Sequence, residues 1–547
     1  MSEWAHPAWP LLLGAALAAV LPTPGRRVVA VAAPALALAL AWTLPEGEIG
    51  GRLMGLPLVW LRADALARVF AIVFALITTL GATYALATPR RGLLAGALTA
   101  AAAGEGIVLA GDWVTLYLAW ETLAVASFML IVDGGARAWA PAFRYLLVHA
   151  AGGALLLAGI IAHLTAGGAA QVGAVGLGGP GTLILLAFAI NAAIPPLHAW
   201  LTDAYPESSP AGTVFLSAFA TKSAVYVLAR VFAGEPALVW AGVAMALYGV
   251  VFAVLENDIR RLLGYHIVSQ VGYMVAGVGL GTPMALSGAA AHAFCHILYK
   301  GLLMMGAGAV VHATGGRRRL TELGGLASAM PATVALYMIG ALSISGAPLL
   351  NGFVSKSLVI AAAEAEHRGG VVMLLTLASV GTFLHTGLKL PWFTFGGPAG
   401  GAAPAAVPAP MLAAMLATAG LCALTGMAPG LLYGLLPYQV QWRPYTADHV
   451  LESLQLLAGT LVGFLLLRRQ LGGEPTVTLD AHRLYQAIGR LITARVAPAL
   501  ARAADLAEAA SYAIVASPPP TRPALSQPIG YAALLAVLLL GIALILL

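Results

Sequence analysis

Long apolar stretches recur along the whole chain of 547 residues, and short polar connections separate them. Most of the stretches are about 17–25 residues long, the length that an α-helix needs to cross a bilayer. Apolar residues follow one another without the alternation of a transmembrane strand, so the pattern excludes a transmembrane β-barrel. The stretches lie at 8–22, 28–44, 66–88, 93–111, 113–132, 143–166, 182–202, 211–232, 237–255, 262–280, 285–313, 330–360, 370–395, 410–427, 449–467 and 529–547. We therefore predict an all-α integral membrane protein with about 14–16 transmembrane helices.

One segment near the C-terminus has a different pattern. In 480–515, arginines are interspersed with leucines and isoleucines at helical spacing, which is typical of an amphipathic helix in the membrane interface. Three consecutive prolines, 518–520, then break the chain before the last apolar stretch. We expect 471–547 to form this amphipathic helix and a terminal anchor helix. The simpler alternative for the amphipathic part is a linker that lies on the surface.

The composition narrows the function classes. Apolar residues make up 60% of the chain and charged residues 9%, whereas a soluble domain carries about 25% charged residues. The two cysteines, Cys295 and Cys422, are too few for a zinc knuckle, an iron–sulfur cluster or a disulfide framework. The sequence also lacks a phosphate-binding glycine loop. We expect no metal, no cofactor and no catalytic centre of the chain's own.

The formal net charge of +6 needs no nucleic-acid partner, because the basic residues gather in loops. Under the span count above, the loops that are rich in arginine fall on one side of the membrane. The positive-inside rule places that side in the cytoplasm and the N-terminus outside, in a multi-pass protein of the cell inner membrane. The arginines of these loops are Arg26, Arg27, Arg90, Arg91, Arg137, Arg260, Arg261, Arg317, Arg318, Arg319, Arg468 and Arg469.

Two of the predicted spans contain helix-breaking residues. Pro195 and Pro196 interrupt the seventh span, and Gly346 and Pro348 interrupt the twelfth. Broken helices at corresponding places in two halves of a membrane protein are the best sequence indication of an ion or substrate site. The simpler alternative is a kink that serves only packing.

Several ionisable residues lie inside the apolar stretches. Such residues are costly to insert and are functional candidates by default. Glu121 is the one carboxylate that we expect deep in a span, and Lys222 lies near the middle of another. A buried lysine can exchange its proton near neutral pH. The alternatives are a structural ion pair for Glu121 and a Lys222 side chain that reaches the interface.

A third group lies on one predicted helix. His292, His296 and Lys300 are spaced four residues apart and therefore share a helix face. Two imidazoles followed by an amine can each accept and pass on a proton. Lys356 follows the second break, so the polar groups together suggest a proton relay within the membrane.

Two further residues, His385 and Lys389, lie in the thirteenth span. They are accessory candidates, with a position near the membrane interface as the alternative.

Several of these segments resemble one family over roughly residues 65–400. The chain resembles the antiporter-like proton-translocating subunits that Mrp cation/proton antiporters, respiratory complex I and membrane hydrogenases share, and it is most similar to the D-type subunit of Mrp antiporters. The blocks that carry the resemblance are WETLAVASFMLI, PPLHAWLTDAYPESSP, FLSAFATKSAVYVLARVF, ENDIRRLLGYHIVSQVGYMVAGVGLGT, HAFCHILYKGLLMMGAGAVVHATG and APLLNGFVSKS.

The resemblance implies two inverted repeats of five helices with broken helices 7 and 12. The expected division is 1–92 for N-terminal helices, 93–232 and 237–395 for the repeats, 396–470 for C-terminal helices and 471–547 for the tail. The resemblance also implies a proton relay, which is formed by Glu121, Lys222, His292, His296, Lys300 and Lys356.

The chain departs from the family at one position. The family usually has a lysine five residues before the helix-7 proline, as partner of the helix-5 glutamate, and counting back from Pro196 gives Asn191. An asparagine cannot carry a proton. Either Glu121 pairs with Lys222 instead, or only the C-terminal half moves protons.

We expect a proton-translocating subunit of a multi-subunit membrane complex, with Mrp-type Na⁺/H⁺ antiport as the leading function. Its partners would be other membrane subunits, protons, Na⁺ as a candidate second ion, and the lipid bilayer. The alternatives are a redox-driven pump subunit of a complex I- or hydrogenase-like complex, a subunit for proton-coupled inorganic-carbon uptake, and a non-conducting scaffold.

Overall fold

The computed structural model describes residues 6–53, 56–398, 400–401 and 403–472, together with single positions at 481, 485, 487, 490, 494, 495 and 502. In these residues, eleven helices are long and apolar enough to cross a membrane, and three shorter apolar helices accompany them. Every apolar stretch predicted between 8 and 467 coincides with a helix or with consecutive helical segments. The all-α membrane class is therefore confirmed. The amphipathic helix predicted in 480–515, apart from those single positions, and the span predicted at 529–547 lie outside the described residues.

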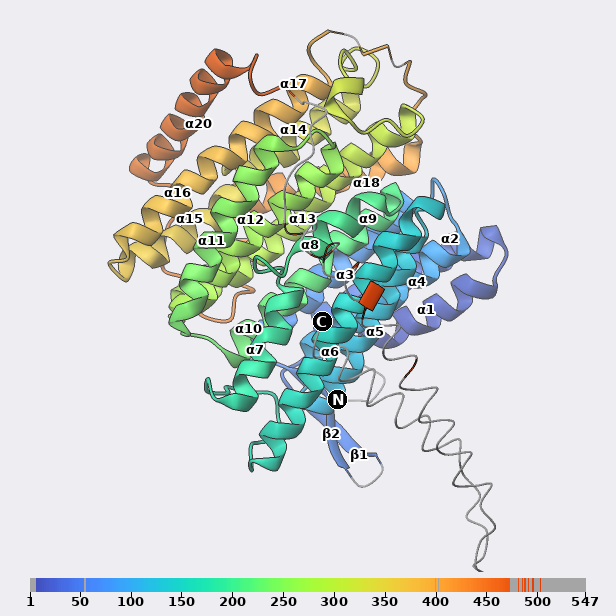
Figure 1. Cartoon of the computed structure of the whole chain (residues 1–547), viewed down its shortest axis with the longest axis vertical. Coiled ribbons are helices and arrows are strands. Elements are labelled where there is room, and N and C mark those ends of the chain that lie inside the picture. The colour runs from blue at the N-terminus through green and yellow to red at the C-terminus, as the bar shows by residue number, and fades with distance from the viewer. Residues whose placement is uncertain are drawn as a thin grey trace, which may run out of the picture. The chain divides into compact units, whose positions relative to one another are not determined.

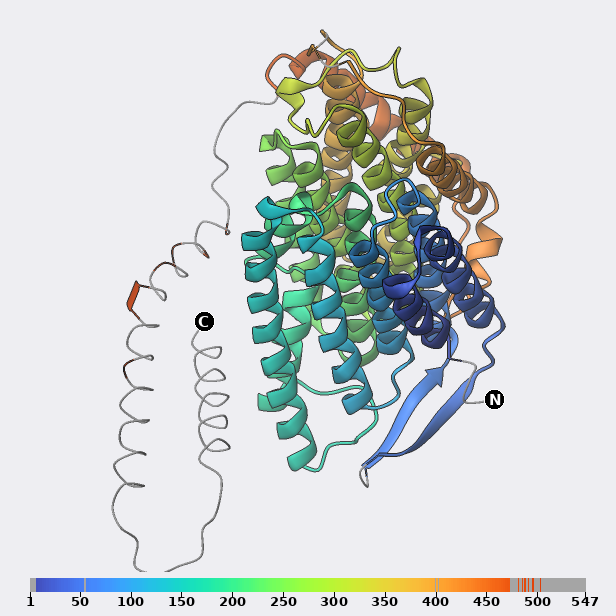
Figure 2. The same cartoon turned by 90° about the vertical axis from the view of Figure 1, so that its right-hand side faces the viewer.

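The N-terminal part contains a hairpin that the hydrophobic pattern did not predict. Its two antiparallel strands connect two membrane helices, and Glu48 pairs in register with Arg62. Figure 2 shows the hairpin projecting at one end of the helices. The elements are α1 (Ala8–Val20), α2 (Thr23–Thr43), β1 (Gly47–Leu53), β2 (Leu56–Ala63) and α3 (Ala65–Ala85).

A first run of five spans follows, and its fourth and fifth spans are both interrupted. The predicted break at Pro195 and Pro196 separates α7 from α8. A second interruption, at Phe219 between α9 and α10, was not predicted. The elements are α4 (Arg91–Leu109), α5 (Trp113–Val132), η2 (Ala136–Ala138), α6 (Trp139–Thr165), α7 (Gly179–Asn191), α8 (Ala199–Ala204), η3 (Tyr205–Glu207), α9 (Pro210–Ala218) and α10 (Ala220–Val231).

A second run of five spans has irregularities in the same two places. The predicted break separates α14 from α15, and Gly346 adopts the left-handed conformation there with φ 81°. In the fifth span a π-helical segment, η5, joins α16 to α17. The elements are α11 (Pro236–Leu255), α12 (Ile259–Leu280), α13 (Pro283–Ala313), η4 (Leu320–Glu322), α14 (Pro331–Ser345), α15 (Asn351–Ala365), α16 (Gly369–Thr382), η5 (Phe383–Lys389) and α17 (Leu390–Thr394).

Helix α13 forms the centre of the described bundle. Its 31 residues are almost all buried, and it contacts α3, α9, α12, α14, α15 and α18. Figure 1 shows it between the N-terminal helices and the helices α14–α16. The remaining elements are α18 (Ala409–Met427), α19 (Pro429–Tyr433) and α20 (Ala447–Leu467). Polar groups on α13 are therefore placed far from the lipid-facing surface.

Arginine-rich loops meet at one end of the bundle. Arg90 contacts Asp133 at 2.5 Å, and Arg318 contacts Glu207 at 2.5 Å and Asp258 at 2.7 Å. Arg90 thus joins the connection α3–α4 to the connection α5–α6, and Arg318 joins the connection α13–α14 to η3 and to the connection α11–α12. We call this end of the bundle the basic-loop end.

Candidate functional site: buried lysines and histidines along α13

The three polar residues predicted to share one face of α13 are completely buried. His292, His296 and Lys300 each have 0% exposure. The ring of His292 contacts Ser355 Oγ at 3.1 Å through Nδ1 and the hydroxyl of Tyr299 at 3.4 Å through Nε2. Both neighbours are hydroxyl groups, which can donate and accept hydrogen bonds. They can therefore adapt to either protonation state of the imidazole.

The second imidazole continues the line. The ring centroids of His292 and His296 are 6.3 Å apart, and the ring of His296 meets that of Tyr299 edge-on at 5.3 Å. Neither nitrogen of His296 has a hydrogen-bond partner among the described residues. Buried polar groups are nearly always satisfied by protein or by water.

The buried lysines are bound to main-chain carbonyls. Lys222 Nζ donates to Ser217 O at 2.7 Å and to Thr221 Oγ1 at 3.1 Å, beside the interruption between α9 and α10. Lys356 Nζ donates to Ile344 O at 2.7 Å, beside the break between α14 and α15. The interrupted helices thus supply free carbonyls in the bundle interior, as irregular backbone at membrane depth can.

Lys300 is held in the same way by a neighbouring helix. Its Nζ donates to Leu263 O of α12 at 3.1 Å. No ion pair with a carboxylate binds Lys222, Lys300 or Lys356 in the part of the chain that the structure describes. Each amine can therefore change its charge without breaking an ion pair.

These residues form one electrostatic group. Lys222 acts through its charge on His292, His296 and Lys300, and Lys356 acts on both histidines. Lys356 also lies 5.2 Å from the ring centre of Tyr273. The structure thus brings together five of the six predicted relay residues, and Lys222 links the first run of helices to the second.

The sixth relay residue, Glu121, lies elsewhere. It is only half-buried on α5, and its carboxylate rests against Gly153 of α6. The described residues show no ion pair between Glu121 and Lys222, whose ammonium bonds go to Ser217 and Thr221. Asn191 is the last residue of α7, is 3% exposed, and has no described hydrogen-bond partner for its Oδ1.

The expectation that Glu121 is the one deep carboxylate is wrong. Glu105 of α4 is 0% exposed, and neither carboxyl oxygen has a hydrogen-bond partner among the described residues. The only signal in the sequence is a single glutamate flanked by alanines and glycines. An apolar stretch does not tell which of its faces meets protein and which meets lipid.

The accessory pair, His385 and Lys389, is buried in the bundle and not exposed at its surface. The two side chains are 2% and 1% exposed. Lys389 Nζ donates to Val254 O at 2.5 Å and to Glu256 O at 3.0 Å, where α11 ends. His385 lies beside His266 of α12, a buried histidine that no sequence pattern singled out.

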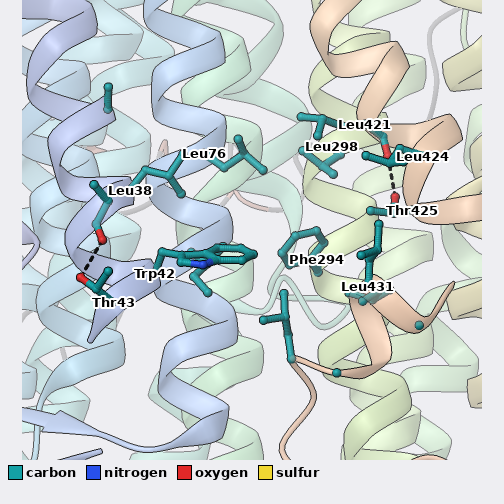
Figure 3. Close-up of a pocket in the computed structure, with 17 residues that line it drawn as sticks. Leu38, Trp42, Thr43, Leu76, Phe294, Leu298, Leu421, Leu424, Thr425 and Leu431 are labelled. Carbon is teal, nitrogen blue, oxygen red and sulfur yellow. Dashed lines mark hydrogen bonds between the residues drawn. The ribbon is translucent and has the colours of Figure 1, made fainter. Parts of the chain in front are cut away.

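An apolar cavity of about 830 Å³ lies behind α13, among α2, α3, α18 and α19. Figure 3 shows Trp42 and Phe294 pointing toward each other in this cavity. Its threonines, Thr43 and Thr425, donate to carbonyls of their own helices, and its other described lining residues are aliphatic, aromatic or glycine. None of the described lining residues is titratable, so the cavity supplies no side chain that could relay a proton.

Comparison with known proteins agrees with this arrangement. The family described as NADH:quinone oxidoreductase/Mrp antiporter, transmembrane, matches residues 110–384. The N subunit of NADH-quinone oxidoreductase from Desulforudis audaxviator is 34% identical over 273 residues, which cover 46% of this chain and 54% of the relative. The D-type subunit of the Na⁺/H⁺ antiporter from Alkalihalophilus pseudofirmus is 32% identical over 281 residues, which cover 47% of this chain and 57% of the relative.

A solved structure is similar over a longer range. A chain of the Mrp complex from Dietzia sp. DQ12-45-1b has a TM-score of 0.71 and 25% identity, and the match covers 85% of this chain and all of that chain. The chain spans about half the length of the curated relatives it matches. Because the family match covers half of the chain and includes the whole buried group along α13, the chain belongs to the NADH:quinone oxidoreductase/Mrp antiporter transmembrane family.

Proposed function

We propose that this chain is a proton-translocating subunit of a multi-subunit membrane complex. Protons move along a relay formed by Lys222, His296, His292, Lys300 and Lys356. The observation that carries the proposal is that these five titratable side chains are all buried, with exposures of 0–4%, and are linked electrostatically. An inert scaffold would have no reason to bear the cost of burying three lysines without carboxylate partners.

The chemistry of the relay follows from its groups. A lysine ammonium gives a proton to a neutral imidazole, which passes it on through its second nitrogen. The hydroxyls of Ser355 and Tyr299 touch His292 and can reorient with each transfer. In a low-dielectric interior, a positive charge on one member opposes a second charge nearby. Protons therefore move through the relay one at a time.

The leading assignment within the family is an Mrp-type Na⁺/H⁺ antiport subunit of the D type, in a cell inner membrane. Similarity to the D-type subunit of a Na⁺/H⁺ antiporter supports it. A redox-driven pump subunit is the second candidate, since similarity to the N subunit of NADH-quinone oxidoreductase favours it equally. In the antiport case the opposing movement of Na⁺ supplies the driving force, and in the redox case a partner redox module supplies it, because the relay itself contains no energy source.

The N-terminal half has a smaller part in this proposal. Lys222 contributes to the relay along α13, while Glu121 has no described ion pair and Asn191 cannot carry a proton. We infer that the C-terminal set together with Lys222 carries the proton flux. This proposal departs from both interpretations that Asn191 left open, because Lys222 belongs to the N-terminal half but takes part without Glu121.

The proposal is tested by proton flux in liposomes that hold the assembled complex. Lys300→Gln and Lys356→Gln should abolish flux, because an amide keeps polarity but does not take up or release a proton. His312→Gln is the matched control, since His312 lies on the exposed end of the same helix, α13. Wild-type flux in both lysine variants, at normal assembly, would leave only the scaffold function.

A further inference from the structure

Two buried histidines outside the relay lie side by side. The ring centroids of His266, on α12, and His385, in η5, are 5.6 Å apart. The two residues are 0% and 2% exposed, and none of their four ring nitrogens has a hydrogen-bond partner among the described residues. A neutral imidazole always carries one N–H donor. A buried N–H donor without a partner is costly, so two such donors side by side call for a functional explanation.

The π-helical segment is what brings His385 to this place. Pro391 lacks the N–H that would bond to the carbonyl of Gly387, and the helix widens over the residues just before it. Tyr337 of α14 donates to Thr386 O at 3.3 Å and satisfies one carbonyl of the widened turn. The segment ends at Lys389, so it holds an imidazole and an amine on neighbouring turns.

The histidine pair is connected to the relay on one side. Lys300 Nζ donates to Leu263 O, and His266 lies one helical turn further along α12. The charges of Lys300 and Lys356 both act on His266, as do those of His385 and Lys389. The pair therefore belongs electrostatically to the same group as Lys300.

On its other side, the histidine pair adjoins Lys389, which lies near the basic-loop end of the bundle. Lys389 donates to the carbonyls of Val254 and Glu256, where α11 ends and the connection to α12 begins. The next residue but one, Asp258, is the partner of Arg318 at the basic-loop end. Lys389 thus lies between the interior and a loop that is partly exposed.

The position of Lys389 also parallels that of Lys222. Each lysine lies in the fifth span of its run, beside an interruption of the helix, and each donates to main-chain carbonyls. Lys222 is a member of the relay, which supports an equivalent part for Lys389.

We propose that His266, His385 and Lys389 form a branch of the relay that joins Lys300 to the basic-loop end at Glu256. The branch rests on the proposed function, because protons would enter or leave the relay described above through it. A proton moves from the Lys389 ammonium to neutral His385, then to His266, and then to the neutral amine of Lys300. Each step transfers one proton and changes no other bond. Because the branch ends among the basic loops, it connects the relay to the face of the membrane that we predict to be cytoplasmic.

The test compares flux in the assembled complex for His266→Gln, His385→Gln and the control His312→Gln. Each of the first two should lower flux at least about tenfold, as expected when a positioned acid–base group is lost. Lys389→Arg keeps the charge and the bonds to the carbonyls, but a guanidinium does not release its proton, so it should lower flux as well. Near wild-type flux in Lys389→Arg would overturn the branch even if the histidine variants failed to assemble.

A second measurement separates proton transfer from a structural role. In His385→Ala, imidazole added on the face of the basic loops should restore part of the flux, and imidazole on the opposite face should not. If flux stays low with imidazole on either face, His385 is structural and the branch is refuted. Lys356→Gln serves as the reference. Blocked flux in Lys356→Gln with normal flux in the histidine variants rejects the branch alone, whereas normal flux in Lys356→Gln and Lys300→Gln rejects the proposed function itself.

Discussion

The Nδ1 atom of His292 and the hydroxyl of Ser355 lie 3.1 Å apart, and this contact joins the continuous helix α13 to the segment that follows the break in the twelfth span. Ser355 directly precedes Lys356, so the contact places an imidazole next to the lysine that is bound at the break. Movement of α15 relative to α13 would therefore change the path between the two titratable groups.

Removal of this contact should weaken transport without stopping it. Ser355→Ala deletes two buried hydrogen bonds, one with His292 and one to Asn351 O of its own helix, each worth about 0.5–1.5 kcal/mol, but leaves the imidazole in place. We expect a partial loss of flux, between the wild-type value and that of His292→Ala, in the liposome assay. Ser357→Ala is the matched control, because Ser357 donates to Phe353 O of its own helix. Equal losses in Ser355→Ala and Ser357→Ala would mean that the contact with His292 is unimportant.

Glu121 and Lys222 should differ in their effect. Lys222→Met removes a titratable group that acts on His292 and His296 and should abolish flux. Glu121→Gln should leave flux near the wild-type value, because Glu121 is half-buried and has no described ion pair with the relay. The initial rate of proton uptake by the liposomes measures the effects of both substitutions. A loss in Glu121→Gln as large as in Lys222→Met would restore Glu121 to the relay.

The ion pairs of Arg318 should contribute to stability and not to transport. Arg318 connects Glu207 with Asp258 and also donates to Pro206 O at 2.9 Å. Arg318→Ala should reduce the free energy of unfolding by about 1 kcal/mol, since these pairs are partly exposed. Thermal melting of the purified protein measures the loss, which should shrink in high salt. The neighbouring Arg319→Ala, which removes only a 3.6 Å pair with Glu322, should have a smaller effect.

Stability should fall in acid through Asp64, the N-cap residue of α3. Burial acts to raise the pKa of Asp64, but the hydrogen bonds and charge of Arg230 outweigh it and hold this pKa below its ordinary value of 3.8. A lowered folded-state pKa stabilises the fold above the ordinary value, and this stabilisation is lost as the pH falls through the folded-state pKa.

The melting temperature of the wild type should therefore drop below pH 3.8. Asp64→Asn should melt lower than the wild type at neutral pH and show a smaller drop in acid. Glu48→Gln, at an exposed pair with Arg62, is the control. An unchanged acid profile in Asp64→Asn would show that other carboxyl groups cause the drop.

The sequence predicted those helices and those site residues that local chemistry alone determines. Prolines and a left-handed glycine broke the two helices as expected, because Pro196 lacks the N–H that a helix needs and Gly346 adopts a positive φ without the steric cost of a side chain. The spacing of His292 and His296 placed them on one face because the helix repeat alone fixes it.

Other features depend on tertiary packing and could not be predicted. The interruption at Phe219 involves neither proline nor glycine, and it accompanies the bond of Lys222 to Ser217 O. Glu105 lies deeper than Glu121 because α4 lies in the interior and α5 at the edge. In a membrane protein the lipid-facing side of a helix is as apolar as its buried side, so the pattern carries no sign of this difference.

The hairpin β1–β2 affects how this protein can be divided experimentally. Asp112 accepts hydrogen bonds from Val114 and Thr115 at the start of α5 and from Val59 of the hairpin at 2.7 Å, while Gly111 N donates to Val59 O. The family match begins at residue 110, next to this junction. The border of sequence similarity thus lies where the hairpin is hydrogen-bonded to the start of α5, and a fragment that begins there would keep Asp112 but lose its contacts with Val59.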